Sequence, residues 1–304
     1  MSVLLDKSNR VLVQGITGQM ARFSVTDMRA YGTNVVAGVV PGRSGDVEGV
    51  PIFPDVATAM RETGADTSIA YIPGHASRGG ILEAIEVGCR LVVYPGDQIP
   101  IQDAIEMRAA AVANGCALVG PNTAGLISPG KAKLGFMPSF CYTPGNLGVV
   151  SKSGSLSYEV AQRLTRAGIG QSTVIGIGGD PVKGLRAIEA IELLHADRET
   201  HAILVMGEIG GNDEYAVAGY ASRGDAKPVA ALMVGRTAPA GKRMGHAGAL
   251  IGNETESYEA KWRALANAGV DMAESLSHVV QAVTRAMSRA HRASGPDRPA
   301  AQTV

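Results

Sequence analysis

Short apolar runs alternate with amphipathic stretches of helical length along most of this chain, and that alternation constrains the fold more than any other feature. In the first part of the chain, runs of strand length cover residues 11–14, 34–40, 67–72, 91–94 and 116–119. Helical patterns separate them, as in residues 101–114. Strands that alternate with helices need crossover connections, so the pattern predicts an α/β fold with parallel, helix-covered sheets.

The alternation restarts after residues 121–146, a stretch rich in glycine, proline and serine. The length of 304 residues also favours two domains of ordinary size. We therefore predict one domain over residues 1–122, a connecting segment over 123–146 and a second domain over 147–290. Residues 291–304 are small, polar and contain proline, which is typical of a flexible tail.

Charge and cysteine content exclude several classes of protein. The 28 basic and 28 acidic residues balance, which argues against a nucleic-acid surface. No apolar run reaches the ~20 residues of a membrane helix, and the first residues lack a signal peptide pattern. Three widely spaced cysteines give neither a metal-type spacing nor a disulfide framework. We therefore expect a reduced, cytoplasmic protein without a metal site of its own.

A glycine turn follows the first predicted strand and opens a helix, with Gly15 and Gly18 in the stretch QGITGQ. Such a turn lets main-chain N–H groups approach a phosphate at the start of a helix. The pattern lacks the third glycine of a dinucleotide fingerprint, so a tight turn without a ligand remains the alternative.

Arg43 follows the second predicted strand, where an NAD site would carry an acidic residue. An arginine can pair with a phosphorylated ribose, which favours coenzyme A (CoA) or NADP over NAD. The plain alternative is a solvated turn residue.

His246 lies in a loop of small residues between Gly245 and Gly248. A neutral imidazole is a competent nucleophile near neutral pH, because its unperturbed pKa is about 6.5. In such a loop the ring can reach a group that another domain brings in. A surface histidine without a function is the simpler interpretation.

Two further segments carry groups that suit phosphoryl chemistry. Glu208 comes at the end of a predicted parallel strand, and its carboxylate can hydrogen-bond one nitrogen of a histidine. The stretch SKSGS at residues 151–155 lies between a strand and a helix, where N–H groups and hydroxyls favour a phosphoryl group. A solvated carboxylate and an ordinary helix cap are the alternatives.

Together these segments resemble the α subunit of succinyl-CoA synthetase (succinate–CoA ligase), over about residues 1–285. The resemblance rests on these stretches: MSVLLDKSNRVLVQGITG, YGTNVVAGVVPG, GPNTAGLISPG, VVSKSGSLSYE, GQSTVIGIGGDPVKG, GEIGGNDE and GKRMGHAGA. An unrelated Rossmann protein would share only the first glycine turn.

The resemblance implies a Rossmann-like CoA-binding domain followed by a flavodoxin-like ligase domain. The residues that it implies for CoA are Thr17, Gly18, Gln19 and Met20 at the turn, Arg43, Pro73, and Gly96, Asp97 and Gln98.

In the second domain the resemblance implies that His246 is transiently phosphorylated and that Glu208 orients it. Ser153, Gly154 and Ser155 would hold the phosphoryl group, and Tyr158, Asn122 and Thr123 would border the acid. A separate β subunit of ATP-grasp type would bind ATP or GTP with Mg²⁺, in an αβ or α2β2 assembly. The absence of a GxxxxGKS or GxxxxGKT phosphate loop from this sequence agrees with that division of labour.

Three departures from the family bear on the substrate. The family usually has threonine, glutamate and glycine at Gly96-Asp97-Gln98, and Tyr94-Pro95 before them is also unusual. Where this chain has Ala124 the family has proline, and where it has Thr123 the family often has cysteine. At residues 19–21 the family has a small residue, then glutamine, then glycine. Succinate is the expected dicarboxylate, and malate, as in malate–CoA ligase, is the first alternative. A non-catalytic CoA sensor and an NADP-dependent oxidoreductase are the more distant ones.

Overall fold

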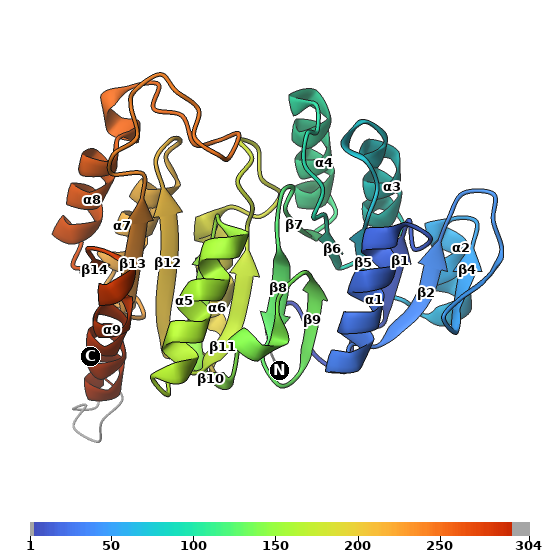
Figure 1. The fold of residues 1–304 in the computed structure, drawn as a ribbon, viewed down its shortest axis with the longest axis horizontal. Coiled ribbons are helices and arrows are strands. Elements are labelled where there is room, and N and C mark those ends of the chain that lie inside the picture. The colour runs from blue at the N-terminus through green and yellow to red at the C-terminus, as the bar shows by residue number, and fades with distance from the viewer. Residues whose placement is uncertain (1–2, 294–304) are drawn as a thin grey trace, which may run out of the picture.

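The computed structural model of the protein describes residues 3–293, which form two seven-stranded sheets side by side (Figure 1). The first sheet has the order β3-β4-β2-β1-β5-β6-β7, and every pair is parallel except β3 with β4. Its strands are β1 (Val11–Gln14), β2 (Val35–Val39), β3 (Gly45–Val47), β4 (Val50–Phe53), β5 (Thr67–Ala70), β6 (Leu91–Val93) and β7 (Ala117–Val119).

Four helices cover this sheet: α1 (Gln19–Tyr31), α2 (Val56–Thr63), α3 (Gly74–Glu86) and α4 (Ile101–Ala113). Successive strand residues face opposite sides, so Leu12 packs in one core with α2, α3 and α4 while Val11 and Val13 pack in another with α1. The parallel arrangement brings the carboxyl ends of β1, β2, β5 and β6 to one edge. Ligands bind at that edge in open α/β sheets.

The second sheet has the order β14-β13-β12-β10-β11-β8-β9, and its centre is again parallel. Its strands are β8 (Gly125–Ser128), β9 (Ala132–Gly135), β10 (Pro144–Ser151), β11 (Gln171–Gly176), β12 (Ala202–Glu208), β13 (Val229–Val234) and β14 (Asp271–Ala273). Its helices are α5 (Gly154–Arg166), α6 (Ala187–Ala196), α7 (Asp213–Ala221), α8 (Tyr258–Asn267) and α9 (Val279–Ala293), with short 3-10 turns η1 (Ser139–Cys141), η2 (Glu254–Glu256) and η3 (Leu276–His278).

The segment 123–146 is more regular than its composition indicated, because it holds the antiparallel hairpin β8–β9 and the start of β10. Gly125 and Gly135 pair across this hairpin with φ of 106° and 94°. A Cβ on either would overlap the main chain of the opposite strand. These two glycines allow the strands to pack closely. Composition alone does not distinguish such strand glycines from the glycines of a loop.

The two sheets share one buried core. Val13 and Ile69 of the first sheet belong to the same apolar cluster as Leu134 and Val150 of the second. Across the junction the Thr33 hydroxyl donates to the Lys133 carbonyl at 2.8 Å. The packing therefore fixes the carboxyl edges of both sheets relative to each other.

Helix α9 extends to Ala293, and the rest of the expected tail lies outside the described residues. Within residues 3–293, no helix combines the length and apolar character needed to cross a membrane.

Candidate functional site

His246 lies in the long irregular loop between β13 and η2, which runs over the second sheet towards the first domain (Figure 1). The loop turns at His246, whose carbonyl accepts the Ala249 N–H at 3.1 Å. Gly248 donates its N–H to the Gly179 carbonyl at 2.9 Å, and Gly245 takes φ of 62°, which favours glycine. The small residues therefore let the loop fold tightly against the segment after β11.

The His246 ring contacts Glu208 at the end of β12, with 2.7 Å between Nδ1 and Oε2. The Glu208 side chain is 8% exposed, whereas the His246 side chain is 25% exposed. The hydrogen bond to Glu208 raises the pKa of His246 above its ordinary value, although burial opposes the rise. An Nδ1–H that donates to the carboxylate fixes the tautomer, so Nε2 is the nitrogen left for chemistry.

The other face of the ring rests on a glycine-rich segment at residues 178–180. A Cβ on Gly179 would overlap the His246 ring, so only glycine allows this approach. The Gly179 N–H bonds the Asn122 carbonyl at 3.3 Å, and the Asn122 amide donates to Asp180 Oδ1 at 3.0 Å. Asn122, one of the expected substrate residues, is thus tied directly to the segment that supports His246.

A cavity of about 520 Å³ lies between the two domains at this point. Asp97 and Gln98 from the first domain line it, together with Asn122 and with Gly245 and Ala247, which flank His246. The structure therefore brings the expected CoA segment and the histidine loop to one space, although the two are far apart in sequence.

Packing explains one departure from the family pattern. Tyr94 is 1% exposed, and its hydroxyl donates to the Ile72 carbonyl at 2.8 Å. In that position it fills the space that a Cβ at residue 96 would need. Tyr94 and Gly96 thus form a matched pair, and the threonine that the resemblance led us to expect at residue 96 would not fit beside this tyrosine.

Gln98 takes φ of 58°, at the position where the resemblance led us to expect glycine. A left-handed backbone is unfavourable for glutamine. Its side chain is exposed at the cavity, so this position adds an amide to the cavity lining.

The glycine turn of the first domain is held by main-chain bonds. Gly15 takes φ of 71° and donates its N–H to the Val39 carbonyl at 2.8 Å. A Cβ there would overlap the Tyr71 carbonyl, so glycine is required. Helix α1 then begins at Gln19 with Gly18 as its N-cap, and the side chains of Gln19 and Met20 are exposed.

The two remaining CoA candidates lie at neighbouring strand ends. Arg43 is exposed on the turn after β2, and Pro73 is the N-cap residue of α3 after β5. Strands β1, β2 and β5 are adjacent and parallel, so these residues share one edge with the glycine turn.

The stretch SKSGS at residues 151–155, the serine segment, leads into α5. Ser153 is the N-cap residue, and its hydroxyl accepts the Leu156 N–H at 3.4 Å. Gly154 follows at the first turn, where an added Cβ would lie 3.0 Å from the Ala124 Cβ. Ser155 is exposed, and the helix start leaves main-chain N–H groups for an anion.

Tyr158 and Thr123 are more enclosed. Burial raises the pKa of Tyr158 to about 12, so this phenol stays neutral. The Thr123 hydroxyl bonds the Gly176 carbonyl and accepts the Gly125 N–H at 2.9 Å. In this structure that hydroxyl joins strands rather than facing the cavity.

Sequence reasoning did not single out Gly179, Asp180 or Arg243. Gly179 and Asp180 lie in the stretch GQSTVIGIGGDPVKG, which carried the resemblance without an assigned role. The approach of Gly179 to the His246 ring, and the bond of Asp180 to Asn122, depend on tertiary packing. Arg243 lines the cavity from the histidine loop, a position that only the loop's folding reveals.

Two family models match this chain, the CoA binding domain at residues 6–94 and CoA-ligase at residues 150–283. Full-length relatives are also close. The α 1 subunit of ADP-forming succinate–CoA ligase from Archaeoglobus fulgidus is 47% identical over 94% of this chain and 98% of its own length. The corresponding α subunit from Aquifex aeolicus is 44% identical over 94% of each chain.

The chain belongs to the succinate–CoA ligase α-subunit family.

This family assignment confirms the expected α/β class, with a CoA-binding domain before a ligase domain, and the expected enzyme class of ligase. It also implies a β-type partner, because the relatives are named as α subunits. The relatives' names do not favour the malate alternative.

Solved structures show the same fold. ATP citrate lyase from Methanothrix soehngenii, in complex with citrate and coenzyme A, matches with a TM-score of 0.89 at 23% identity, covering 99% of this chain and 54% of that one. Acetyl-coenzyme A synthetase 1 from Ca. Korarchaeum cryptofilum matches with a TM-score of 0.73 at 20% identity, covering 90% and 59%. This chain thus spans just over half the length of these larger proteins.

Proposed function

We propose that this chain is the α subunit of a nucleotide-dependent succinate–CoA ligase and that His246 carries the phosphoryl group. The observation that carries the proposal is the 2.7 Å contact between His246 Nδ1 and Glu208. Gly245 and Ala247, on either side of His246, line a cavity together with the CoA candidates Asp97 and Gln98. The names of the full-length relatives support succinate and an ADP-forming reaction.

The chemistry proceeds in three transfers. The His246 Nε2 lone pair attacks the terminal phosphorus of the nucleotide, and the nucleoside diphosphate leaves. The acid's carboxylate then takes the phosphoryl group, which frees the imidazole and forms an acyl phosphate. Finally the CoA thiol, as thiolate, attacks the acyl carbon, and inorganic phosphate leaves.

Glu208 supports the first two transfers electrostatically. Phosphorylation at Nε2 leaves the proton on Nδ1 and a positive ring, which the adjacent carboxylate stabilises. The α5 N-terminus with Ser153, Gly154 and Ser155 supplies N–H groups and hydroxyls for the phosphoryl oxygens. Phosphoryl transfer depends mostly on such positioning and charge stabilisation.

In this proposal CoA binds along the carboxyl edge of the first sheet. The glycine turn and the α1 N-terminus take the phosphates, and Arg43 pairs with the ribose phosphate. The thiol end reaches the cavity beside Asp97 and Gln98. The acid occupies the same cavity near Asn122, whereas Tyr158 and Thr123 lie outside its lining.

A β subunit of ATP-grasp type completes the enzyme as αβ or α2β2, and it binds ATP or GTP with Mg²⁺. Among residues 3–293, no group of three or more histidine, cysteine or acidic side chains is arranged to hold a metal ion. We place the enzyme in the cytoplasm, where its three buried free cysteines stay reduced.

The test is to purify this chain with and without its β-type partner and to measure thioester formation from succinate and from malate. We expect activity only with the partner, and a higher kcat/KM for succinate. A preference for malate would change the substrate, whereas activity of the isolated chain would refute the subunit assignment.

A further inference from the structure

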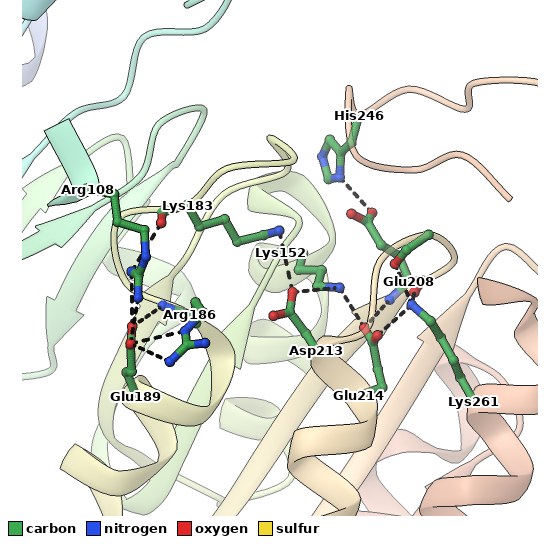
Figure 2. Close-up of polar contacts among 11 residues, drawn as sticks. Arg108, Lys152, Lys183, Arg186, Glu189, Glu208, Asp213, Glu214, His246 and Lys261 are labelled. Atoms are coloured by element: carbon green, nitrogen blue, oxygen red, sulfur yellow. Dashed lines mark hydrogen bonds and ion pairs between the residues drawn. The ribbon is translucent and has the colours of Figure 1, made fainter. Parts of the chain in front are cut away.

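Glu208 is held from behind by a buried network of charged side chains. Figure 2 shows Glu214 and Lys261 on the side of Glu208 that faces away from His246. Lys261, on α8, is fully buried, and Glu214, on α7, is 1% exposed. Neither residue carried a role in the sequence-based prediction.

The main-chain N–H and carbonyl of Glu208 form hydrogen bonds with Glu214 and Lys261, respectively. The Glu208 N–H donates to Glu214 Oε1 at 3.2 Å, and Lys261 Nζ donates to the Glu208 carbonyl at 2.9 Å. Lys261 also contacts Glu214 Oε2 at 2.6 Å and donates to the Gly210 carbonyl at 2.5 Å. One ion pair thus clamps the last residue of β12 and the turn that follows it.

The network continues to the helix that begins with the serine segment. Lys152, which precedes Ser153, contacts Glu214 at 2.7 Å and Asp213 at 3.2 Å. Lys183 contacts the same Asp213 at 3.4 Å. Burial alone would raise the pKa of Asp213, but the two lysines hold it below its usual value. Three lysines thus face Asp213, Glu214 and Glu208.

Burying charged side chains costs free energy, so such a network is an inefficient way to stabilise a core. Burial lowers the pKa of Lys261, which shows the cost of its charge in this place. Replacing a buried ion pair by apolar residues of similar size is often neutral or stabilising, so stability alone gives weak grounds for its presence. In the turn after Glu208, the Ile209 side chain is buried in the core, and Gly210 and Gly211 follow at φ of 81° and 60° without side chains to fix them.

We propose that Lys261 and Glu214 are positioning residues for the phosphohistidine step, because they fix the Glu208 main chain and thereby aim its carboxylate at His246 Nδ1. This inference rests on the proposed role of His246. It assigns the pair to phosphorylation of the histidine, and not to binding of CoA. Loss of the clamp lets the carboxylate drift, and misplacements of about 1 Å can cost roughly 100-fold in rate.

The test uses a double variant that keeps the net charge, Lys261→Met with Glu214→Gln. A matched control is Lys133→Met with Asp27→Asn, since Lys133 is also fully buried and paired with a carboxylate, but on β9. Two quantities are measured: the rate of His246 phosphorylation in the complex with the β-type partner, and the pKa of His246 by NMR titration of the full isolated chain.

We expect the double variant to phosphorylate at least about tenfold more slowly, with the pKa of His246 lowered towards its ordinary value. The charged groups that act on this ring are Glu208, Asp180 and Lys183, and the variant leaves all three in place. The control should change neither quantity. The milder Glu214→Gln alone should show a smaller loss of the same kind, and it serves if the double variant does not fold.

An unchanged phosphorylation rate and an unchanged His246 pKa in the folded variants would overturn the positioning role. Failure of the wild-type chain to accept phosphate would refute the proposed function instead. The NMR titration would still decide the positioning role in that case, because it needs neither nucleotide nor partner.

Discussion

The glycine turn of the first domain and the Glu208 region of the second both lie at the carboxyl ends of parallel strands, but they bury different groups. The turn is shaped by main-chain bonds of Gly15, and its candidate side chains Gln19, Met20 and Arg43 face outward. Around Glu208 the charged side chains are paired, and Lys152, Glu214 and Lys261 are buried, while the histidine is partly exposed. A diffusing cofactor needs an open, preformed surface, whereas a transferred phosphoryl group needs fixed charges.

The largest effect should come from His246→Asn, because asparagine removes the nucleophilic nitrogen. We expect complete loss of phosphorylation and of ligase activity, with CoA affinity unchanged. Phosphate incorporation and CoA titration of the same preparation measure the two sides of the comparison. A parallel loss of CoA binding would mean that the two regions are not separable.

Glu208→Gln should reduce the phosphorylation rate by about 10- to 100-fold. Glu208 raises the pKa of His246, so its loss should lower that pKa and shift the pH–rate profile to lower pH. The rate rises with pH in both proteins, since neutral imidazole is the nucleophile. A profile whose midpoint stays in place would show that the carboxylate does not act on the ring.

The contact between His246 and Glu208 also predicts how the stability of the fold changes with pH. The pKa of His246 is raised in the folded protein, so this contact stabilises the folded state more when His246 is protonated. This contribution to the unfolding free energy is fully present below about pH 6.5 and is lost as pH rises through the raised pKa. Glu208→Gln should therefore destabilise the protein more at pH 5.5 than at pH 9, which denaturant titrations at the two values can measure. Equal destabilisation at both would contradict it.

Arg43→Glu tests the region around the glycine turn of the first domain. We expect the Kd for CoA to rise by about tenfold or more, with a much smaller change for dephospho-CoA, because only CoA carries the 3′-phosphate that Arg43 is proposed to pair with. Arg43→Gln is the milder control. Equal losses for both ligands would place Arg43 elsewhere than at the ribose phosphate.

The smallest effect concerns the matched pair of Tyr94 and Gly96. Tyr94→Phe removes the hydroxyl that donates to the Ile72 carbonyl and should cost about 1 kcal/mol of unfolding free energy. His246 phosphorylation should not change. Denaturant titration checks the first expectation, and a loss of phosphorylation would show that this hydroxyl does more than support the loop.

The sequence predicted the α/β class, the restart of the pattern in a second domain and the family. It did not predict the β8–β9 hairpin, because Gly125 and Gly135 look like loop residues until the strands are paired. It also paired Glu208 with His246 as a possibility, and the structure places the two 2.7 Å apart.

The support of that contact was beyond sequence reasoning. Gly179, Glu214 and Lys261 act through packing between segments that are distant along the chain. A buried lysine at residue 261 cannot be distinguished from a surface lysine by its helical neighbours alone. The serine segment was predicted as a helix start, and α5 indeed begins there, but its role with phosphate stays a prediction.

The most direct measurement is a single-turnover experiment on the chain with its β-type partner and nucleotide labelled at the terminal phosphate. The account predicts acid-labile, base-stable label on His246 that is discharged when succinate and CoA are added together, with one thioester formed per label lost. Label that never forms on His246, or that persists while thioester accumulates, would contradict it.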